Sequence, residues 1–437
     1  MNHMAKKEEG LVRSVGVLGL SANIINIIIG SGIFALPAII ASYMGAQSII
    51  AYIVCGFLMA LVMLCFAEAG SKVTNTGGPY TYIETAFGDY AGFLAGILCI
   101  GSFLSADAAV SNALINAIAS AYPVFGHGWI RFSVLFVLFY GLVYLNVIGL
   151  KQGLGLVKFN TIAKLIPLLI LIAFGMTHIS TSNLSFSGMP SIKTLGEASL
   201  ILFFAFQGCE NGVIVGGEVI NPKRTIPKAI FISIITVLVI YILIQTVSQG
   251  ILGNTLPNFK NAPLAETAKV ILGSFGFILL TVGACISMFG NVSGSVLNNP
   301  RVIYALSRDK VIPIKALSKV HKSFATPYVA IIIYATIGFI FAVTGSFEQL
   351  IIISSSGMLL IYLGVALSVI KLRKTQKPQL GEFKIPGGWT VPILSIIIIL
   401  YFLSHLTQNE MIGTALFIGT LTIVYGFIRM FKNKKQH

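Results

Sequence analysis

The sequence predicts an all-α integral membrane protein with twelve transmembrane helices. Of its 437 residues, 56% are hydrophobic and only 10% are charged, and the mean hydropathy is +0.90. A soluble chain of this length would need many more polar residues to cover its surface. Apolar stretches of about 20 residues, long enough to cross ~30 Å of hydrocarbon, recur from end to end. We expect no cleavable signal peptide, because the first apolar stretch is longer than a signal core.

The twelve expected spans follow one another without a soluble domain between them. Most of the 29 Lys and Arg residues fall in segments that share one side if the N-terminus is cytoplasmic. This positive-inside bias predicts a multi-pass plasma-membrane protein with both termini in the cytoplasm. The net charge of +15 therefore indicates membrane topology. We expect membrane lipid as a partner and no nucleic acid. The expected spans are 14–41, 45–71, 87–121, 129–149, 155–177, 195–220, 229–252, 268–304, 327–345, 348–370, 389–407 and 411–431.

Cysteine and histidine placement argues against metal and cofactor chemistry. All five cysteines fall within expected spans and form no paired motif, so neither a disulfide framework nor a zinc site is predicted. No cluster of His, Cys or Asp offers a nucleophile, a base or a metal site. We therefore expect no enzyme activity, no cofactor and no bound metal.

The first expected span is interrupted near its middle by Gly30, Ser31 and Gly32. Non-helical backbone at bilayer depth must line a cavity or be buried in protein, because lipid cannot bond a freed amide. An opened helix exposes N–H groups and the positive end of a half-helix dipole, which favour a carboxylate. The break predicts a site for a small anionic group halfway across the membrane, as transporters have.

The sixth expected span has a similar interruption, in which Gln207, Gly208, Cys209 and Glu210 follow an apolar run. Five spans separate the starts of the two interrupted segments, so the second set runs through the membrane in the opposite direction. Broken helices at corresponding places of two inverted halves are the best sequence pointer to a transporter's binding site. The alternative is a pair of glycine packing faces, because glycine is common in membrane helices.

Lys164 lies about one third of the way into the fifth expected span. A charge at such depth is costly and usually faces a cavity or a partner. We interpret Lys164 as an ion-coupling residue, a fixed or titrating cation in the place of a bound sodium ion. The alternative is a lysine whose ammonium group snorkels to the inner surface.

Three of the acidic residues within the expected spans are candidates for a functional role. Glu210 has four roles open: it carries the coupling proton, hydrogen-bonds the broken helix, faces a cationic substrate, or serves structure alone. Asp107 either binds a substrate amine or pairs with a hydroxyl group or with Lys164. We expect Glu218 in an inner gate or in a structural ion pair.

Several motifs occur together in a particular order along the chain. They are Gly30-Ser31-Gly32-Ile33-Phe34 with Pro37; Thr76-Gly77-Gly78-Pro79-Tyr80-Thr81-Tyr82 and Phe87-Gly88 in the loop after the second span; Glu210, then Glu218 with Asn221-Pro222-Lys223-Arg224 and Pro227; and Tyr304-Ala305-Leu306-Ser307-Arg308-Asp309. In this order and spacing they resemble the amino acid–polyamine–organocation (APC) superfamily of permeases, over nearly the whole chain.

The resemblance implies a five-plus-five inverted-repeat fold with broken first and sixth helices, two additional helices, and transport by alternating access. Amino acids or related amines are the implied substrates. The corresponding segments are a cytoplasmic tail at 1–13, the two repeats at 14–177 and 195–370, the additional helices at 389–431, and a cytoplasmic tail at 432–437.

The resemblance also implies a substrate site. In this family the substrate carboxylate meets the amides of the first break, and the ammonium group meets backbone carbonyls beside both breaks. An aromatic residue at the position of Phe204 closes over the substrate. Lys164 matches the lysine of sodium-independent members, which favours proton coupling or exchange. The expected substrate-binding residues are Ile28, Gly30, Ser31, Gly32, Asp107, Phe204, Gln207, Gly208 and Cys209.

The substrate class stays open. Glu210 is similar to the glutamate of basic amino acid and polyamine antiporters, yet both tryptophans, Trp129 and Trp389, lie near span ends and cannot cage a cationic chain. We expect a sodium-independent amino acid transporter, proton-coupled or an exchanger, acting as a monomer or homodimer. Neutral amino acids are at least as well supported as cationic ones. The alternatives are a cationic amino acid or polyamine antiporter and a non-transporting amino acid sensor.

Overall fold

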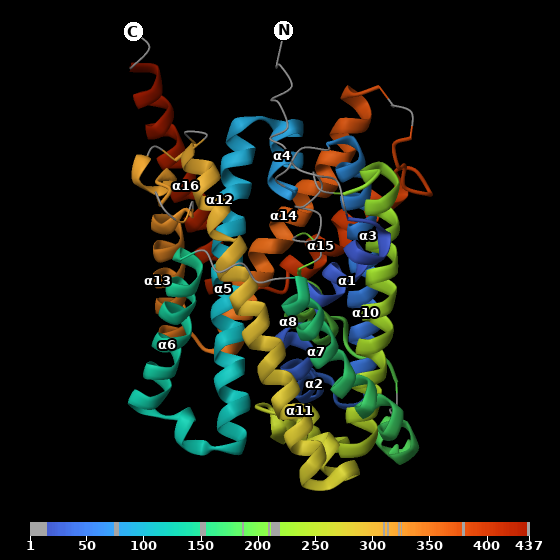
Figure 1. The fold of residues 1–437 in the computed structure, drawn as a ribbon. Coiled ribbons are helices and arrows are strands. Elements are labelled where there is room, and N and C mark those ends of the chain that lie inside the picture. The colour runs from blue at the N-terminus through green and yellow to red at the C-terminus, as the bar shows by residue number, and fades with distance from the viewer. Residues whose placement is uncertain are drawn as a thin grey trace.

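Helices are the only regular elements in the part of the chain that the computed structural model describes, apart from one isolated bridge between Val15 and Val219. Most helices lie along one direction and form a single bundle (Figure 1). The described residues are 15–73, 78–148, 154–185, 188–208, 210, 219–308, 311–312, 314–321, 324, 326–377 and 381–434.

The longer helices occupy the apolar segments, and short 3-10 helices connect several of them. The α-helices are α1 Val17–Ile28, α2 Ser31–Met44, α3 Ser48–Lys72, α4 Pro79–Phe87, α5 Asp89–Ala121, α6 Gly128–Val147, α7 Leu154–Gly175, α8 Ile192–Phe206, α10 Pro222–Leu252, α11 Pro263–Asn298, α12 Pro300–Arg308, α13 Tyr328–Thr344, α14 Phe347–Thr375, α15 Thr390–Leu403 and α16 Gln408–Lys434. The 3-10 helices are η1 Gly45–Gln47, η2 Pro123–Gly126, η3 Met176–His178, η4 Thr181–Leu184, η6 Gly253–Phe259 and η7 Lys315–Ser318.

Seven helical runs of the described chain are long and apolar enough to cross a membrane. Shorter apolar helices, among them α1, α13 and α15, accompany them. The protein is therefore a multi-pass membrane protein. The seven runs are Ser31–Lys72, Asp89–Ala121, Gly128–Val147, Lys223–Phe259, Pro263–Arg308, Phe347–Thr375 and Gln408–Met430.

Two segments differ from the sequence expectation. The stretch expected as a loop after the second span contains helix α4, and the end of the eighth expected span is a separate helix, α12. Both helices begin with a proline, Pro79 and Pro300, whose fixed φ suits the first helical position although it breaks a preceding helix. Gly78, which precedes α4, has a φ of +61°, a conformation that favours glycine.

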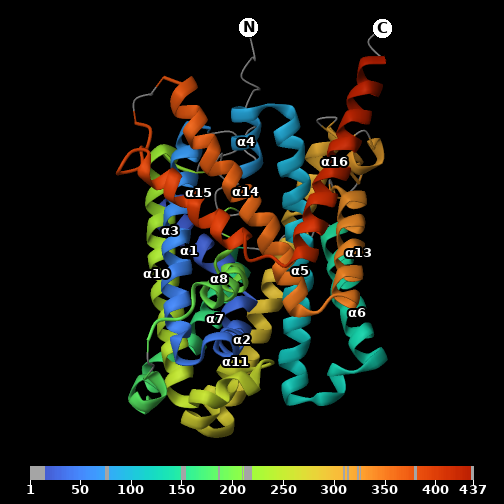
Figure 2. The same ribbon diagram turned by 180° about the vertical axis from the view of Figure 1, so that it is seen from behind.

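The broken helices lie in the centre of the bundle. Helix α5 packs along α14, and α3 packs along α10, and these two pairs flank α1, α2 and α8 (Figure 2). Nearly all of α2 from Ser31 to Ala41 is buried. The interrupted backbone is therefore enclosed by protein, which is the condition for non-helical backbone at membrane depth.

A cluster of ion pairs joins the C-terminal ends of α3 and α14. Glu68, which is 1% exposed, accepts hydrogen bonds from Nε and Nη2 of Arg373, each at 2.6 Å. The same carboxylate accepts the amide of Ile385 at 2.9 Å, and Lys72 pairs with Glu382 at 3.0 Å. Because bidentate charge-assisted bonds are strong and directional, the connection between α14 and α15 is fixed against α3.

We expect Glu68→Gln to lower the melting temperature of the purified protein, because Arg373 would keep a buried charge without a carboxylate. Breaking a buried ion pair typically costs about 3–5 kcal/mol. The double variant Glu68→Gln/Arg373→Gln should recover part of the loss. As a control, Glu197→Gln removes an exposed partner of Lys193 and should change little. Equal effects of the two single variants would contradict this account of the cluster.

Candidate functional site

The first helix break lies between α1 and α2, one residue earlier than its sequence motif. Helix α1 ends at Ile28 and α2 begins at Ser31, so Ile29 (ψ 82°) and Gly30 (φ −111°, ψ −138°) carry the non-helical backbone. Ser31 and Gly32 form the first turn of α2, where amides have no intrahelical acceptor. No side chain caps this terminus. The hydroxyl of Ser31 is buried and has no hydrogen-bond partner within the described residues.

Lys164 from α7 caps the other side of the break. Its Nζ donates to the carbonyls of Asn26 and Ile29, each at 2.9 Å. Ser287 of α11 also donates to the Ile29 carbonyl, at 3.3 Å, and Asn291 donates to the Ile27 carbonyl at 3.4 Å. A cation at a helix C-terminus is favoured by the helix dipole. Lys164 is only 2% exposed, so its ammonium group does not snorkel to a surface.

Tyr241 of α10 links the two broken helices. Its hydroxyl lies 3.1 Å from the carbonyl of Ile28 and 2.9 Å from that of Ala205. The Ile28 carbonyl also accepts the amide of Gly30 at 2.8 Å. Tyr241 was not among the residues predicted from the sequence. The available signal was a phenol in the middle of an apolar helix, since a buried tyrosine hydroxyl usually has a partner.

The second break follows Phe206, where α8 ends. Gly208 has a φ of +113°, and its amide lies 3.0 Å from both carboxylate oxygens of Glu210. Glu210 also accepts the hydroxyl of Tyr362, from α14, at 2.5 Å. Of the roles that the sequence left open for Glu210, the hydrogen bond to the broken helix is the one present in the structure. Cys209 and Glu218, both expected near this break, lie outside the described residues.

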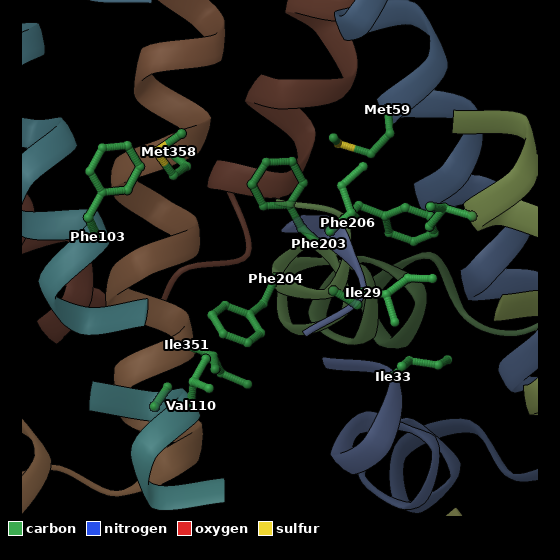
Figure 3. Close-up of a cluster of buried hydrophobic side chains, with 14 of the residues drawn as sticks. Ile29, Ile33, Met59, Phe103, Val110, Phe203, Phe204, Phe206, Ile351 and Met358 are labelled. Carbon is green, nitrogen blue, oxygen red and sulfur yellow. The ribbon is translucent and has the colours of Figure 1, made fainter. Parts of the chain in front are cut away.

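Gln207 and Phe204 face α14. The side-chain amide of Gln207 donates to Ser355 at 3.1 Å and accepts from Ser354 at 2.9 Å. The ring of Phe204 is 7% exposed and points toward Ile351 (Figure 3). The part of α14 that faces the second break therefore carries hydroxyl groups next to an apolar patch.

Asp107 belongs to a different contact set. Its carboxylate accepts the hydroxyl of Tyr334 at 2.6 Å, and Asn299 donates to that same hydroxyl at 2.9 Å. Asp107 and Tyr334 come from α5 and α13, and Asn299 lies between α11 and α12. The sequence left open whether Asp107 binds a substrate amine, a hydroxyl group or Lys164. Its carboxylate accepts a hydroxyl group, and the described contacts include none between Asp107 and Lys164.

Comparison with known proteins identifies the family. The amino acid permease family profile matches residues 15–428. The chain belongs to this family. It is 31% identical to the serine/threonine exchanger SteT of Bacillus subtilis (strain 168), over 97% of this chain and 98% of that protein. It is 26% identical to the branched-chain amino acid permease BcaP of the same organism, over 91% and 89%. It is also 26% identical to the human large neutral amino acids transporter small subunit 2, over 79% and 66%.

Family membership indicates that the two breaks belong to a transporter. The protein is an APC-superfamily permease, a transporter of amino acids and not an enzyme. The described residues contain no group of three His, Cys, Asp or Glu side chains that could hold a metal ion.

Close packing between the two breaks requires a glycine at position 32. A Cβ atom added to Gly32 would lie 2.6 Å from the Cα atom of Ala205 in α8. Backbone cannot move aside as a flexible side chain does. Gly32, which the sequence predicts to bind substrate, thus sets the distance between α2 and α8.

We expect Gly32→Ala to destabilise the permease by about 1–3 kcal/mol, the usual cost of overpacking. Thermal unfolding in detergent measures this loss. Gly101→Ala is the matched control, because Gly101 lies inside α5 and a Cβ there meets nothing within 4 Å. An unchanged melting temperature for Gly32→Ala would show that α2 and α8 can separate freely.

Proposed function

We propose that this permease is a sodium-independent secondary transporter that exchanges small neutral amino acids by alternating access. The observation that carries the proposal is the pair of broken helix ends that Tyr241 links, the first of which Lys164 caps. Discontinuous helices with opposed half-helix ends are the usual substrate sites of such transporters.

The first turn of α2 is the proposed carboxylate site. The amides of Ser31 and Gly32 begin a helix, and the positive end of the dipole favours an anion. The buried Ser31 hydroxyl without a partner supports this role, because an unpaired buried polar group costs free energy that a ligand can recover. Gly30 keeps the backbone beside it open.

The proposed ammonium site consists of the carbonyls of Ile28, Phe204 and Gln207. Phe204 would close over the substrate from α8, and Gly208 would complete the lining. Cys209, also a proposed lining residue, lies outside the described residues. Tyr241 already donates toward the Ile28 carbonyl, so the substrate ammonium would share that oxygen or displace the hydroxyl from it.

Lys164 is the proposed replacement for a sodium ion. In related transporter folds, unwound carbonyls at broken helices coordinate the coupling cation. Here the ammonium group of Lys164 lies 2.9 Å from two carbonyls of the α1 end. A built-in cation at this place supports sodium independence.

Glu210 is the proposed carrier of a coupling proton where transport is proton-linked. Its carboxylate accepts both the Gly208 amide and the Tyr362 hydroxyl. Protonation would weaken both bonds, since charge-assisted hydrogen bonds are roughly twice as strong as neutral ones. Proton loading would then release the second break from α14. Each proton carried inward down ~100 mV would supply about 2.3 kcal/mol.

Neutral substrates are the proposed class. Asp107 and Glu210 each already accept a tyrosine hydroxyl, so a cationic side chain would have to compete with these hydrogen bonds. The name of SteT, a serine/threonine exchanger, supports small neutral substrates.

We further propose the inverted repeats 14–177 and 195–370, the two additional helices 389–431, and a plasma-membrane location with cytoplasmic termini. Glu218 is proposed to lie at the inner gate.

Proteoliposomes containing the purified permease provide the test of function. Vesicles loaded with unlabelled serine should take up labelled serine faster than empty vesicles, equally well with and without sodium. A pH gradient separates proton coupling from pure exchange. Counterflow with lysine, arginine, ornithine and their decarboxylation products tests the cationic alternative. Strict sodium dependence would overturn the proposal, and saturable binding without any flux would indicate a sensor.

Lys164→Gln should reduce the initial rate of serine uptake by at least about tenfold. The carbonyls of Asn26 and Ile29 would lose a charged donor, and hydrogen bonds to charged groups contribute about 1.5–3 kcal/mol. Lys193→Gln, at an exposed pair with Glu197, is the control and should transport normally. Full activity of Lys164→Gln would contradict the role, whereas restored uptake on adding sodium would support a sodium-like position.

A further inference from the structure

A hollow of about 330 Å³ lies at the start of α6. None of its lining residues belongs to α1, α2 or α8. Helix α6 starts at the end of the bundle opposite the end where α16 terminates (Figure 1). Its lining residues are Gly128, Trp129, Arg131, Phe132, Leu135 and Val343.

Arg131 brings a charge to this hollow that no carboxylate neutralises in the described structure. Its guanidinium group donates to the side-chain oxygens of Asn116, at 2.9 Å, and Asn112. Asn112 is itself held by its bonds to the carbonyls of Ala342 and Gly345, at 3.0 and 3.1 Å. Both partners of Arg131 are neutral amides, so the guanidinium group is fixed in position and keeps its full positive charge.

The helix end adds to this positive potential. Helix α6 begins at Gly128, which places Arg131 in its first turn, and this turn contains no acidic residue. The positive end of the helix dipole disfavours a cation in the first turn and favours an anion there. An anion in the hollow would therefore be stabilised by the guanidinium group and by the helix terminus together.

The rest of the surroundings is apolar and open. Trp129 is 81% exposed and packs edge-on against Phe132, with ring centroids 5.6 Å apart. Farther along α6, Phe136 and Val137 are 46% and 68% exposed. Tryptophan is typical of membrane–water interfaces, and exposed apolar residues on the hydrocarbon side of the interface contact acyl chains. The ligand that fits is an amphiphile whose anionic group lies at the interface.

We propose that this hollow binds an anionic phospholipid, whose phosphodiester group contacts Arg131 and whose acyl chains lie along the exposed face of α6. Phosphate oxygens match the planar donor geometry of a guanidinium group. A free phosphate ion would satisfy the charge but not the apolar face below it. The site lies outside the proposed transport pathway, so its occupancy and amino acid transport are separate properties of the permease.

The two tryptophans of the chain make the test specific. Trp389 stands at the start of α15, 5.4 Å from the guanidinium group of Arg373, so Trp389→Phe leaves Trp129 as the only tryptophan. This variant is reconstituted with brominated phosphatidylglycerol or brominated phosphatidylcholine, and the quenching of Trp129 fluorescence gives the relative binding constant. We expect phosphatidylglycerol to bind about fivefold more tightly, the factor expected for one basic residue near a membrane surface.

Arg131→Gln in the same background should abolish this preference, and Arg131→Lys should retain part of it. Lys260→Gln is the control, because it removes a positive charge from the connection between α10 and α11 at the same end of the bundle and should leave the preference unchanged. Equal quenching by the two lipids in the Trp389→Phe protein would overturn the proposal. Loss of the preference on adding millimolar inorganic phosphate would overturn it as well, because the site would then take a free anion.

Discussion

A helix that is interrupted inside a membrane must find new partners for its freed backbone groups. At the first break the protein supplies them on one side only. The carbonyls at the end of α1 meet Lys164, Ser287, Asn291 and Tyr241, whereas the start of α2 has no capping side chain and leaves the Ser31 hydroxyl unpartnered. This asymmetry concerns the partial charges at the two helix ends. The end with negative partial charge is neutralised by protein, and the end with positive partial charge is left for an anion.

Helix α14 carries most of the contacts that hold the second break. Ser354 and Ser355 bind the side chain of Gln207, and Tyr362 binds Glu210. Further along, Arg373 binds Glu68 at the end of α3. Any rocking of α8 against α14 must exchange the first set of bonds. The buried cluster around Arg373 lies at the end of α14, so this helix combines a fixed anchor with exchangeable contacts. That division is what the proposed alternating-access cycle requires of a helix next to the substrate.

The sequence predicted the two breaks because their signal is local: glycine and polar residues at a depth where the chain is otherwise apolar. It missed which residues carry the non-helical backbone at the first break, since Ser31 suits the first turn of α2 as well as the break itself. It also missed Tyr241, Tyr334 and Tyr362. Each of these tyrosines meets a partner far away in the chain, and a tyrosine in an apolar helix gives no local sign of that partner.

The same limit explains α4 and α12. The polar and glycine residues from Thr76 to Gly78 indicate a loop before Pro79, whereas the eighth expected span runs on through Pro300 to residue 304. Pro79 and Pro300 instead start helices, because the first helical position needs no amide hydrogen. The ambiguity is physical: the residue that ends one helix is well suited to begin the next.

Tyr241 is a contact that the two breaks share. A phenol has one hydrogen, yet the Tyr241 oxygen lies within 3.1 Å of the Ile28 carbonyl and 2.9 Å of the Ala205 carbonyl. It can therefore make one full hydrogen bond or two weaker, shared ones. In the proposed cycle, a substrate ammonium group at the Ile28 carbonyl would move the phenol hydrogen to Ala205 and strengthen the bond to α8. Substrate binding at α1 would then alter how firmly α8 is held, without any contact between substrate and α10.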